Sequence, residues 1–325
     1  MSGIVTVYGG SGFVGRHIAR HLAREGWRVR VACRRPNEAM FVRPYGVPGQ
    51  VEPTFCNIRD DTGTGAAMRG TDAVVNCVGT FDASGANSFE PVHVHGAGRI
   101  ARIAAEHGIF RMVHISAIGA DEAGESEYAR TKARGEREIL RHQPKAMILR
   151  PSVVFGSEDM FFNRFAGMAK FCPALPIVGA DTKFQPVHVD DLARAASAGV
   201  LRQHSGVYEI GGPEIKTFRE LMTDMLATIQ HRRMIVNIPF WAARVMAGAF
   251  RVGSTLSGGL LRAPITGDQV SGLRNDSVVS KGSQTLADLG IDATPVGAVI
   301  PEYLWRFRPS GQYAAIKNSA RNLRA

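Results

Sequence analysis

The sequence predicts an α/β protein with a doubly wound parallel sheet and a smaller carboxyl-terminal lobe. Three observations lead to this fold class. Short apolar runs alternate with helix-period segments through the first half, a glycine-rich turn joins the first run to the first helix, and this regularity breaks up after Pro151. Near-continuous apolar runs are typical of strands in a parallel sheet that helices cover on both faces.

Six short apolar runs are predicted to be the strands of this sheet. They are Ile4–Tyr8, Arg28–Cys33, Val51–Cys56, Ala73–Val78, Arg111–Ser116 and Ala146–Arg150. Apolar residues spaced three and four apart predict helices between them at Phe13–Arg24, Val92–His107 and Glu127–Arg141. In the later half we expect helices at Asp159–Phe171 and Asp190–Arg202 and a strand at Gly206–Ile210.

These elements predict a sheet domain over residues 1–155, with residues 184–212 returning to the sheet. Residues 156–183 and 213–308 are expected to form the smaller lobe. Within it, Phe240–Phe250 is apolar on most of its circumference, so it is expected to be a core helix, with an exposed interaction surface as the alternative. The polar, basic segment 309–325 lacks periodicity and is expected to be disordered or ordered by a partner.

The composition belongs to a soluble globular protein. The chain has 325 residues, of which 45% are hydrophobic and 21% charged, which excludes collagen-like and wholly disordered classes. Its four cysteines form no C-x-x-C pair and are too few for a secreted disulfide framework, which indicates a reducing compartment. We expect no metal site. Uninterrupted apolar runs are too short for a spanning helix, and a strand starting at Ile4 leaves no room for a signal peptide.

The chain is strongly basic, with a formal net charge of +10. Arg16, Arg20 and Arg24 recur every four residues and therefore share one helical face. Such a row is usually a solvated face, and the alternative is a docking surface for an acidic protein or an anionic membrane. No aromatic-interleaved motif or zinc-finger spacing supports nucleic-acid binding.

A glycine-rich turn follows the first predicted strand, with the spacing G-x-x-G-x-x-G. In such a turn the first glycine permits the tight turn, the second lets the backbone approach a pyrophosphate, and the third lets helix and strand pack closely. The following helix presents free amides and its positive dipole end to the phosphates. The sequence therefore predicts a Rossmann dinucleotide site that includes Gly9, Ser11, Gly12, Phe13, Val14 and Gly15.

The residues after the second predicted strand indicate NADP rather than NAD. NAD-binding sheets usually carry an Asp or Glu there for the ribose hydroxyls, whereas this chain has Arg34 and Arg35. Two guanidiniums can clamp a 2′-phosphate that a carboxylate would repel. The alternative is that both arginines only cap the sheet edge. The adenine and the adjoining ribose would be flanked by Asn57, Ile58, Val78 and Gly79.

Tyr128 and Lys132 lie four residues apart on one predicted helix, so they share a face. The lysine ammonium would favour the phenolate and grip the nicotinamide ribose, while Ser116, at a strand end, would bind the same substrate oxygen. This trio is compatible with catalysis. It is equally compatible with an inherited binding site in which Tyr128 and Lys132 only hold the ribose.

From Ile4 to about Pro213 these motifs resemble the extended or atypical short-chain dehydrogenase/reductase family. Further segments of this resemblance are RPSVVFG at 150–156, HVDDLA at 188–193 and EIGGP at 209–213. The resemblance implies that a proline loop with Pro151 and Val154 covers the nicotinamide. Many active relatives have Asn where this chain has His93, a departure that bears on turnover.

A narrower resemblance covers nearly the whole chain. It rests on VHVHGA at 92–97, FGSEDMFFNRFA at 155–166, TGDQV at 266–270 and PEYLW at 301–305. These segments are similar to the NADPH-binding accessory subunits of respiratory complex I, the family of the mammalian alpha-subcomplex subunit 9, as it occurs in alphaproteobacteria. The resemblance implies a tightly held, structural NADPH, other complex I subunits as partners, and a position at the junction of the peripheral and membrane arms.

The same resemblance implies a non-catalytic, peripheral protein on the cytoplasmic side of the bacterial inner membrane, with an anionic membrane surface as a further partner. An alternative stays open: a free NADP-dependent reductase or epimerase that uses Ser116, Tyr128 and Lys132. A third possibility is a redox sensor that reports NADPH occupancy to a partner.

Overall fold

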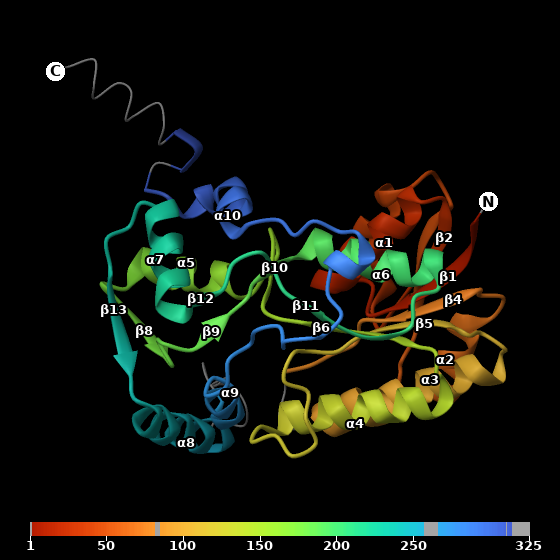
Figure 1. Ribbon diagram of the computed structural model, residues 1–325, viewed down its shortest axis with the longest axis horizontal. Coiled ribbons are helices and arrows are strands. Elements are labelled where there is room, and N and C mark those ends of the chain that lie inside the picture. Colours follow the sequence, from red (N-terminus) through yellow and green to blue (C-terminus); the bar gives the residue numbers. More distant parts are fainter. Residues whose placement is uncertain (1, 82–84, 257–265, 310, 314–325) are drawn as a thin grey trace. The chain divides into compact units, whose positions relative to one another are not determined.

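The computed structural model describes residues 2–81, 85–256, 266–309 and 311–313 (Figure 1). The chain divides into two compact units. The sheet unit comprises Met1–Ser152, Val189–Gly211 and Val279–Ala293, and the smaller unit comprises Val153–His188, Gly212–Val278 and Thr294–Ala325. Residues 279–293, expected in the smaller lobe, lie in the sheet unit because the Glu209 amide donates to the Gln284 carbonyl at 2.8 Å.

The sheet unit is organised around one seven-stranded sheet in the order β11-β6-β5-β4-β1-β2-β3. Each neighbouring pair is parallel. The strands are β1 (Ser2–Tyr8), β2 (Trp27–Cys33), β3 (Val51–Phe55), β4 (Ala73–Asn76), β5 (Arg111–Ile115), β6 (Met147–Pro151) and β11 (Gly206–Ile210). The chain builds outward from β1 in both directions, so the predicted doubly wound fold class is confirmed.

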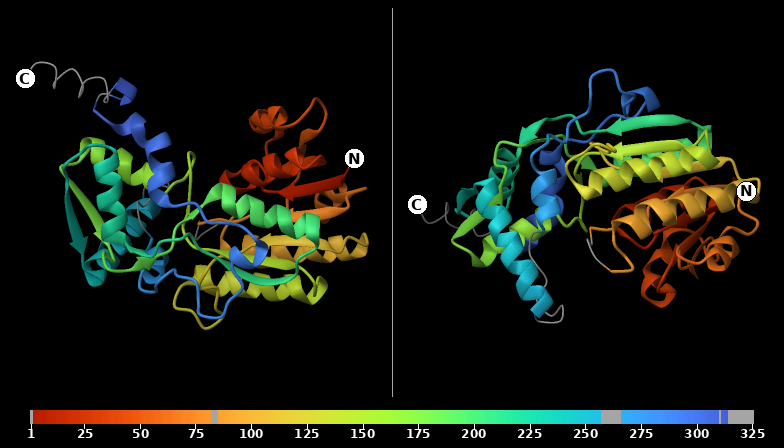
Figure 2. Two further views of the ribbon diagram at one scale, coloured as in Figure 1. Left: turned by 45° about the horizontal axis from the view of Figure 1, so that its top comes forward. Right: turned by 90° about the horizontal axis from the view of Figure 1, so that it is seen from below.

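Helices cover both faces of this sheet (Figures 1 and 2). One face carries α1 (Phe13–Arg24) and α6 (Val189–Arg202), and the other carries α2 (Asp61–Met68), α3 (Ala97–Glu106) and α4 (Glu127–His142). Sheet side chains beneath them, such as Val5, Val7 and Val75, are fully buried. This double burial explains why the central strand β4 is buried along its whole length, whereas the edge strand β3 is only partly buried.

Several boundaries differ from those predicted. The expected helix Val92–His107 is two elements, a π-helix η2 (Glu90–Gly96) followed by α3. Strands β4 and β5 end at Asn76 and Ile115. The sequence did not predict α2 or the 3₁₀-helix η1 (Pro36–Tyr45), since α2 contains two glycines and lacks an apolar stripe. Its start is fixed instead by Asp60, which accepts the Gly63 amide.

The described residues of the smaller unit form three two-stranded sheets, each pairing segments distant in the sequence. They are β7 (Val154–Phe155) with β10 (Val187–His188), β8 (Ala174–Val178) with β13 (Met234–Ile238), and β9 (Lys183–Phe184) with β12 (Lys216–Thr217). Its helices are α5 (Phe162–Phe171), α7 (Phe218–Thr228), α8 (Phe240–Leu256), α9 (Gly267–Gly272) and α10 (Val296–Leu304). Helix α5 starts three residues later than predicted, after an N-cap at Phe161 that makes no side-chain hydrogen bond. Asp159 lies before the helix, and its carboxylate accepts the Asn163 amide at 3.1 Å.

Helix α8 differs from the expected core helix. The Trp241 side chain is 71% exposed and Val245 is 67% exposed, while Ala243 and Ala247 are buried. The side chain of Phe250 lies outside the described residues, as do positions 310 and 314–325 of the predicted tail. Among the described helices, none is both long and apolar enough to span a bilayer.

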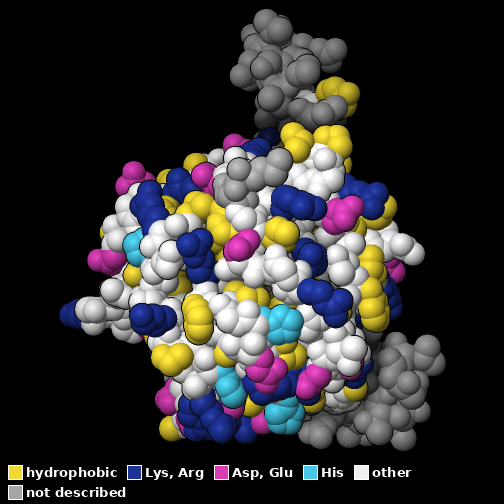
Figure 3. Space-filling model, turned by 90° about the vertical axis from the view of Figure 1, so that its right-hand side faces the viewer, with side chains coloured by type: hydrophobic (Ala, Val, Ile, Leu, Met, Phe, Trp, Pro, Cys, Tyr) yellow, Lys and Arg dark blue, Asp and Glu magenta, His cyan; other side chains and the backbone are white. Residues whose placement is uncertain are grey.

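The arginine row on α1 is only partly solvated. Arg24 is exposed, but Arg16 and Arg20 are half-buried, and the Arg16 guanidinium lies 4.4 Å from the centre of the Phe41 ring. Figure 3 shows that Lys and Arg side chains on one face of the molecule are interspersed with acidic, histidine and apolar ones. The expected solvated row is therefore solvated only in part, since packing on η1 draws Arg16 inward.

Candidate dinucleotide-binding site

The parallel sheet brings most of the predicted site residues to one edge. Segments that follow parallel strands emerge at the same carboxyl edge. At this edge of the sheet unit lie Gly9, Ser11, Gly12, Phe13, Val14, Gly15, Arg34, Arg35, Asn57, Ile58, Val78, Gly79, Ser116 and Pro151. Pro151 lies beside the β5–α4 loop, because its carbonyl accepts the Ile118 amide at 3.0 Å. Val154 belongs to β7 of the smaller unit.

The turn between β1 and α1 packs backbone against backbone. Gly9 has a φ of +73°, a left-handed conformation that suits glycine. A Cβ on Gly15 would lie 2.4 Å from the Gly9 carbonyl oxygen, so only glycine lets the helix approach so closely. Gly12 caps α1 without a side-chain hydrogen bond, and the first turn carries no acidic residue. The first amides and the positive dipole end of α1 are therefore suited to an anion.

Exposed guanidiniums follow β2 at this edge. Arg34 donates to the Asn87 amide oxygen at 3.1 Å, and Arg35 forms an ion pair with Glu38 at 3.1 Å. Glu38 is the first carboxylate after β2. The position at which NAD-binding sheets hold the ribose hydroxyls with an acid is therefore basic here, and the residues present fit a dinucleotide with an additional phosphate.

The residues after β3 and β4 line the same edge. Asn57 accepts the backbone amide of Arg59 at 3.2 Å, and the Val78 amide donates to Asn76 at 3.0 Å. A Cβ on Gly79 would lie 3.6 Å from the Lys132 Nζ. The turn after β4 thus passes directly beside the predicted nicotinamide-binding pair on α4.

Tyr128 and Lys132 share one face of α4, as predicted. The Lys132 Nζ donates to the Ile115 carbonyl at 3.1 Å and lies 5.9 Å from the centre of the Tyr128 ring. Burial lowers the pKa of Lys132 to about 8 and raises the pKa of Tyr128 to about 12. Without cofactor, the phenol is therefore not primed to lose its proton near neutral pH.

Aromatic rings surround Tyr128. Phe81 stacks on it with ring centres 5.3 Å apart and planes 12° apart. Phe89 and His93 meet it edge-on, with ring centres at 6.0 and 5.4 Å. This packing accounts for the loss of solvation that raises the pKa of the phenol.

His93 lies in the π-helix and is buried and neutral. The Thr80 amide donates to its Nε2 at 3.1 Å, so the ring proton resides on Nδ1, which lies 3.1 Å from the Thr131 hydroxyl. Burial, aided by the charge of Lys132, lowers the pKa of His93 to about 3. With both ring nitrogens engaged, His93 fixes the turn after β4 to helix α4.

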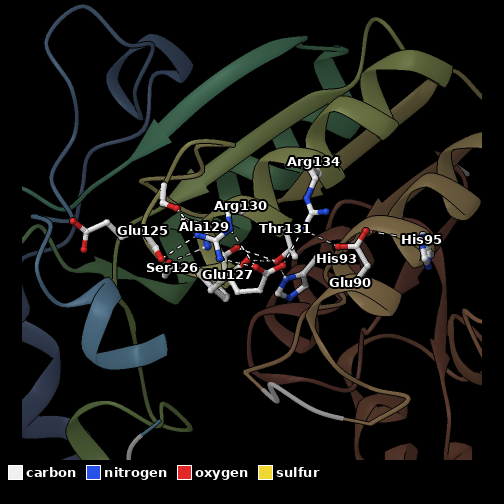
Figure 4. Close-up of polar contacts among 12 residues, drawn as sticks. Glu90, His93, His95, Glu125, Ser126, Glu127, Ala129, Arg130, Thr131 and Arg134 are labelled. Atoms are coloured by element: carbon white, nitrogen blue, oxygen red, sulfur yellow. Dashed lines mark hydrogen bonds and ion pairs between the residues drawn. The ribbon is translucent and has the colours of Figure 1, made fainter. Parts of the chain in front are cut away.

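Further contacts hold the π-helix against the start of α4 (Figure 4). Arg134 forms ion pairs with Glu90 of η2 and Glu127 of α4, both at 2.9 Å. A Cβ at Gly135 would lie 2.0 Å from the His93 carbonyl oxygen, so α4 needs glycine there to admit the π-helix. The π-helix beside the site is therefore stabilised by the ion pairs of Arg134 and by the space that Gly135 leaves.

The Ser116 hydroxyl is hydrogen-bonded to a buried ion pair and is therefore not free to bind a substrate oxygen. Its hydroxyl donates to Glu136, and Glu136 forms an ion pair with Arg150 at 2.6 Å. Ser116 and Glu136 are only 4% and 5% exposed. Sequence reasoning missed this pair, although Glu136 follows Lys132 by four residues and so shares its helix face.

Together these features define a Rossmann-type α/β protein with a candidate dinucleotide site. Comparison with known proteins gives its family. Residues 5–211 match the NAD dependent epimerase/dehydratase family, and the chain belongs to that family. Its organisation also matches solved structures, including the UDP-glucose 4-epimerases of Thermus thermophilus, in complex with NAD (TM-score 0.67, 18% identity, covering 94% of this chain and 99% of that one), and Thermotoga maritima (TM-score 0.70, 16% identity, covering 94% and 98%). These similarities show the fold.

Relatives that align over most of their length define a narrower group. The NADH dehydrogenase (ubiquinone) 1 alpha subcomplex subunit 9 of Arabidopsis thaliana is 33% identical over 96% of this chain and 80% of its own length. The 40 kDa subunit of Neurospora crassa NADH-ubiquinone oxidoreductase is 30% identical over 95% and 80%. The chain belongs to the family of these subunits, which confirms the resemblance inferred from sequence. A ceramide reductase of Caulobacter vibrioides is 31% identical over 59% of each chain.

Proposed function

We propose that this chain is an accessory subunit of a proton-pumping NADH:quinone oxidoreductase and that it holds NADPH as a structural, non-reacting ligand. The observation that carries the proposal is the similarity to complex I subunits over at least 95% of the chain, at 30–33% identity. Its partners are then other complex I subunits, and its place is the junction of the peripheral and membrane arms, on the cytoplasmic side of the inner membrane.

The site supports binding more than turnover. Gly9, Gly12 and Gly15 with the uncapped α1 suit a pyrophosphate, and Arg34 suits a 2′-phosphate. When bound, NADPH supplies a hydride donor. The chain's own groups are poorly set to move the matching proton, because Tyr128 has a pKa raised to about 12.

Two further features point the same way. The Ser116 hydroxyl is bound by Glu136, and His93 is neutral with both ring nitrogens engaged. In this proposal Tyr128 and Lys132 hold the nicotinamide ribose. Bound NADPH then favours the folded subunit by mass action, by about 4 kcal/mol at a thousandfold excess over the dissociation constant.

Purification through an affinity tag from detergent-solubilised membranes of the native host tests this proposal. The tagged chain is expected to co-migrate on native gels with iron–sulfur and quinone-reducing subunits. Arg34→Glu is expected to lose the nucleotide and to reduce the amount of assembled complex, whereas the matched change Arg69→Glu, at the far end of α2, preserves both. A tagged wild-type chain found only as a free soluble oligomer would contradict the proposal.

One observation favours a second function, an NADP-dependent reductase or epimerase. Tyr128 and Lys132 keep the spacing and shared face used for proton transfer to a carbonyl, and the Caulobacter relative is named a ceramide reductase. In this alternative Tyr128 acts as acid and Ser116 positions the substrate oxygen. Repeated oxidation of added NADPH by the purified chain with a panel of carbonyl compounds would support it.

A further inference from the structure

Residues 85–88, which lie between β4 and η2, bind two arginines that follow different strands. Arg34, which follows β2, donates from Nη1 to the side-chain oxygen of Asn87 at 3.1 Å. Arg59, which follows β3, donates from Nη1 to the carbonyl oxygen of Ala86 at 3.3 Å. Adjacent residues therefore bind the guanidiniums of two neighbouring loops, and residues 85–88 connect the carboxyl ends of β2, β3 and β4.

Within the part of the chain that the structure describes, both guanidiniums bind uncharged groups. Among the described residues, no carboxylate lies within ion-pair distance of Arg34 or Arg59, and both are bound by uncharged oxygens. Arg35 differs, because it is paired with Glu38 at 3.1 Å. The guanidiniums of Arg34 and Arg59, which bind to the consecutive residues Asn87 and Ala86, repel each other, so an anion with several acceptor oxygens would relieve this repulsion.

Arg59 is also held in place before any ligand binds. Its backbone amide and its Nε donate to the Asn57 side-chain oxygen at 3.2 and 3.4 Å. These bonds fold the arginine back over the end of β3 and limit the rotamers that its side chain can lose on binding. Arg34 uses one of its five N–H groups on Asn87, which leaves its planar fork suited to phosphate oxygens.

We propose that Arg59, Arg34 and Asn87 form the subsite for the 2′-phosphate of the dinucleotide. In this subsite Arg59 is a second phosphate-binding arginine, supplied by the loop after β3. Asn87 determines specificity, because it is a neutral partner for Arg34 where a carboxylate would pair with Arg34 and repel the phosphate. Arg35 contributes less, since Glu38 already neutralises it. This inference rests on the proposed NADPH binding.

Titration calorimetry with NADPH and NADH on full-length chains, after removal of bound nucleotide on charcoal, tests the subsite. Arg59→Ala is expected to weaken NADPH binding about tenfold to a hundredfold, the size expected for a lost charge-assisted hydrogen bond. Its affinity for NADH, which lacks the phosphate, should change less than about twofold. Asn87→Asp should reduce the preference for NADPH by at least about tenfold, whereas Asn87→Ser should retain it.

Arg69→Ala is the matched control, since it removes one positive charge at the opposite end of α2 and should leave both affinities unchanged. Unchanged NADH affinity shows that each variant is folded. The subsite is refuted if wild-type protein prefers NADPH and Arg59→Ala and Asn87→Asp keep that preference in full. Wild-type protein that binds neither dinucleotide would instead refute the proposed NADPH binding together with this subsite.

Discussion

The buried Glu136–Arg150 pair permits a quantitative prediction for Glu136→Ala. Glu136 is 6% and Arg150 24% exposed as side chains, with 2.6 Å between their charged groups. Removing one partner of a buried pair leaves the other charge uncompensated, at a cost of about 3–5 kcal/mol. A unit of this size loses about 2–4 °C in Tm for each kcal/mol. The variant should therefore melt roughly 6–20 °C below wild type in calorimetry.

Glu138→Ala is the matched control two residues along the same helix. Glu138 is 29% exposed and lies 3.7 Å from an Arg141 that is 73% exposed, so its loss should cost about 0–1 kcal/mol. Ser116→Ala should be destabilising alone but add little to Glu136→Ala, because both changes disrupt one hydrogen-bond network. Equal melting temperatures for the Glu136→Ala and Glu138→Ala variants would refute this account of the pair.

Three further predictions concern the site itself. Gly15→Ala must displace backbone atoms, since its Cβ would lie 2.4 Å from the Gly9 carbonyl oxygen; it should cost about 1–3 kcal/mol in unfolding free energy and lower nucleotide content, measured after acid release. Tyr128→Phe should leave NADH:quinone reductase activity of membranes within about twofold of wild type, and a loss above tenfold would contradict a role limited to holding the nicotinamide ribose. His93→Gln should reduce the loss of unfolding free energy at acid pH, as measured by urea unfolding at several pH values.

The sign of the His93 effect follows from its lowered pKa. The folded state holds this pKa near 3, below its ordinary value, so the unfolded chain binds the extra proton first as pH falls. The contribution of neutral His93 to the free energy of unfolding is fully present above about pH 6.5 and declines as the pH falls toward 3. His93→Gln removes that decline, and identical pH profiles for variant and wild type would contradict the buried, neutral state.

Much of the fold was predictable because its elements carry strong local patterns. The buried strands are apolar runs, α1 (Phe13–Arg24) begins and ends where its spacing indicated, and the glycine turn has a defined steric role. The π-helix was not predictable, because its geometry depends on a glycine at 135, some forty residues away. Helix α2 lacks an apolar stripe and depends on its cap at Asp60.

The chemistry of the site was predictable in part. The positions of Tyr128 and Lys132 on one helix face followed from spacing alone. The bonding of Ser116 to Glu136 did not, since it depends on which way a side chain turns at a strand end. Asn87 and Arg34 are 53 positions apart in the sequence, and no local sequence pattern predicts a contact over such a separation.

The central claim is that this chain holds NADPH within a membrane-bound NADH:quinone oxidoreductase. Its most direct test is mass spectrometry, under native and then denaturing conditions, of the tagged chain isolated from solubilised membranes. The account predicts an assembly with iron–sulfur and quinone-reducing subunits that releases about one NADP(H) per copy of this chain. A chain recovered without those subunits, or an assembly that releases only unphosphorylated NAD or no nucleotide, would contradict it.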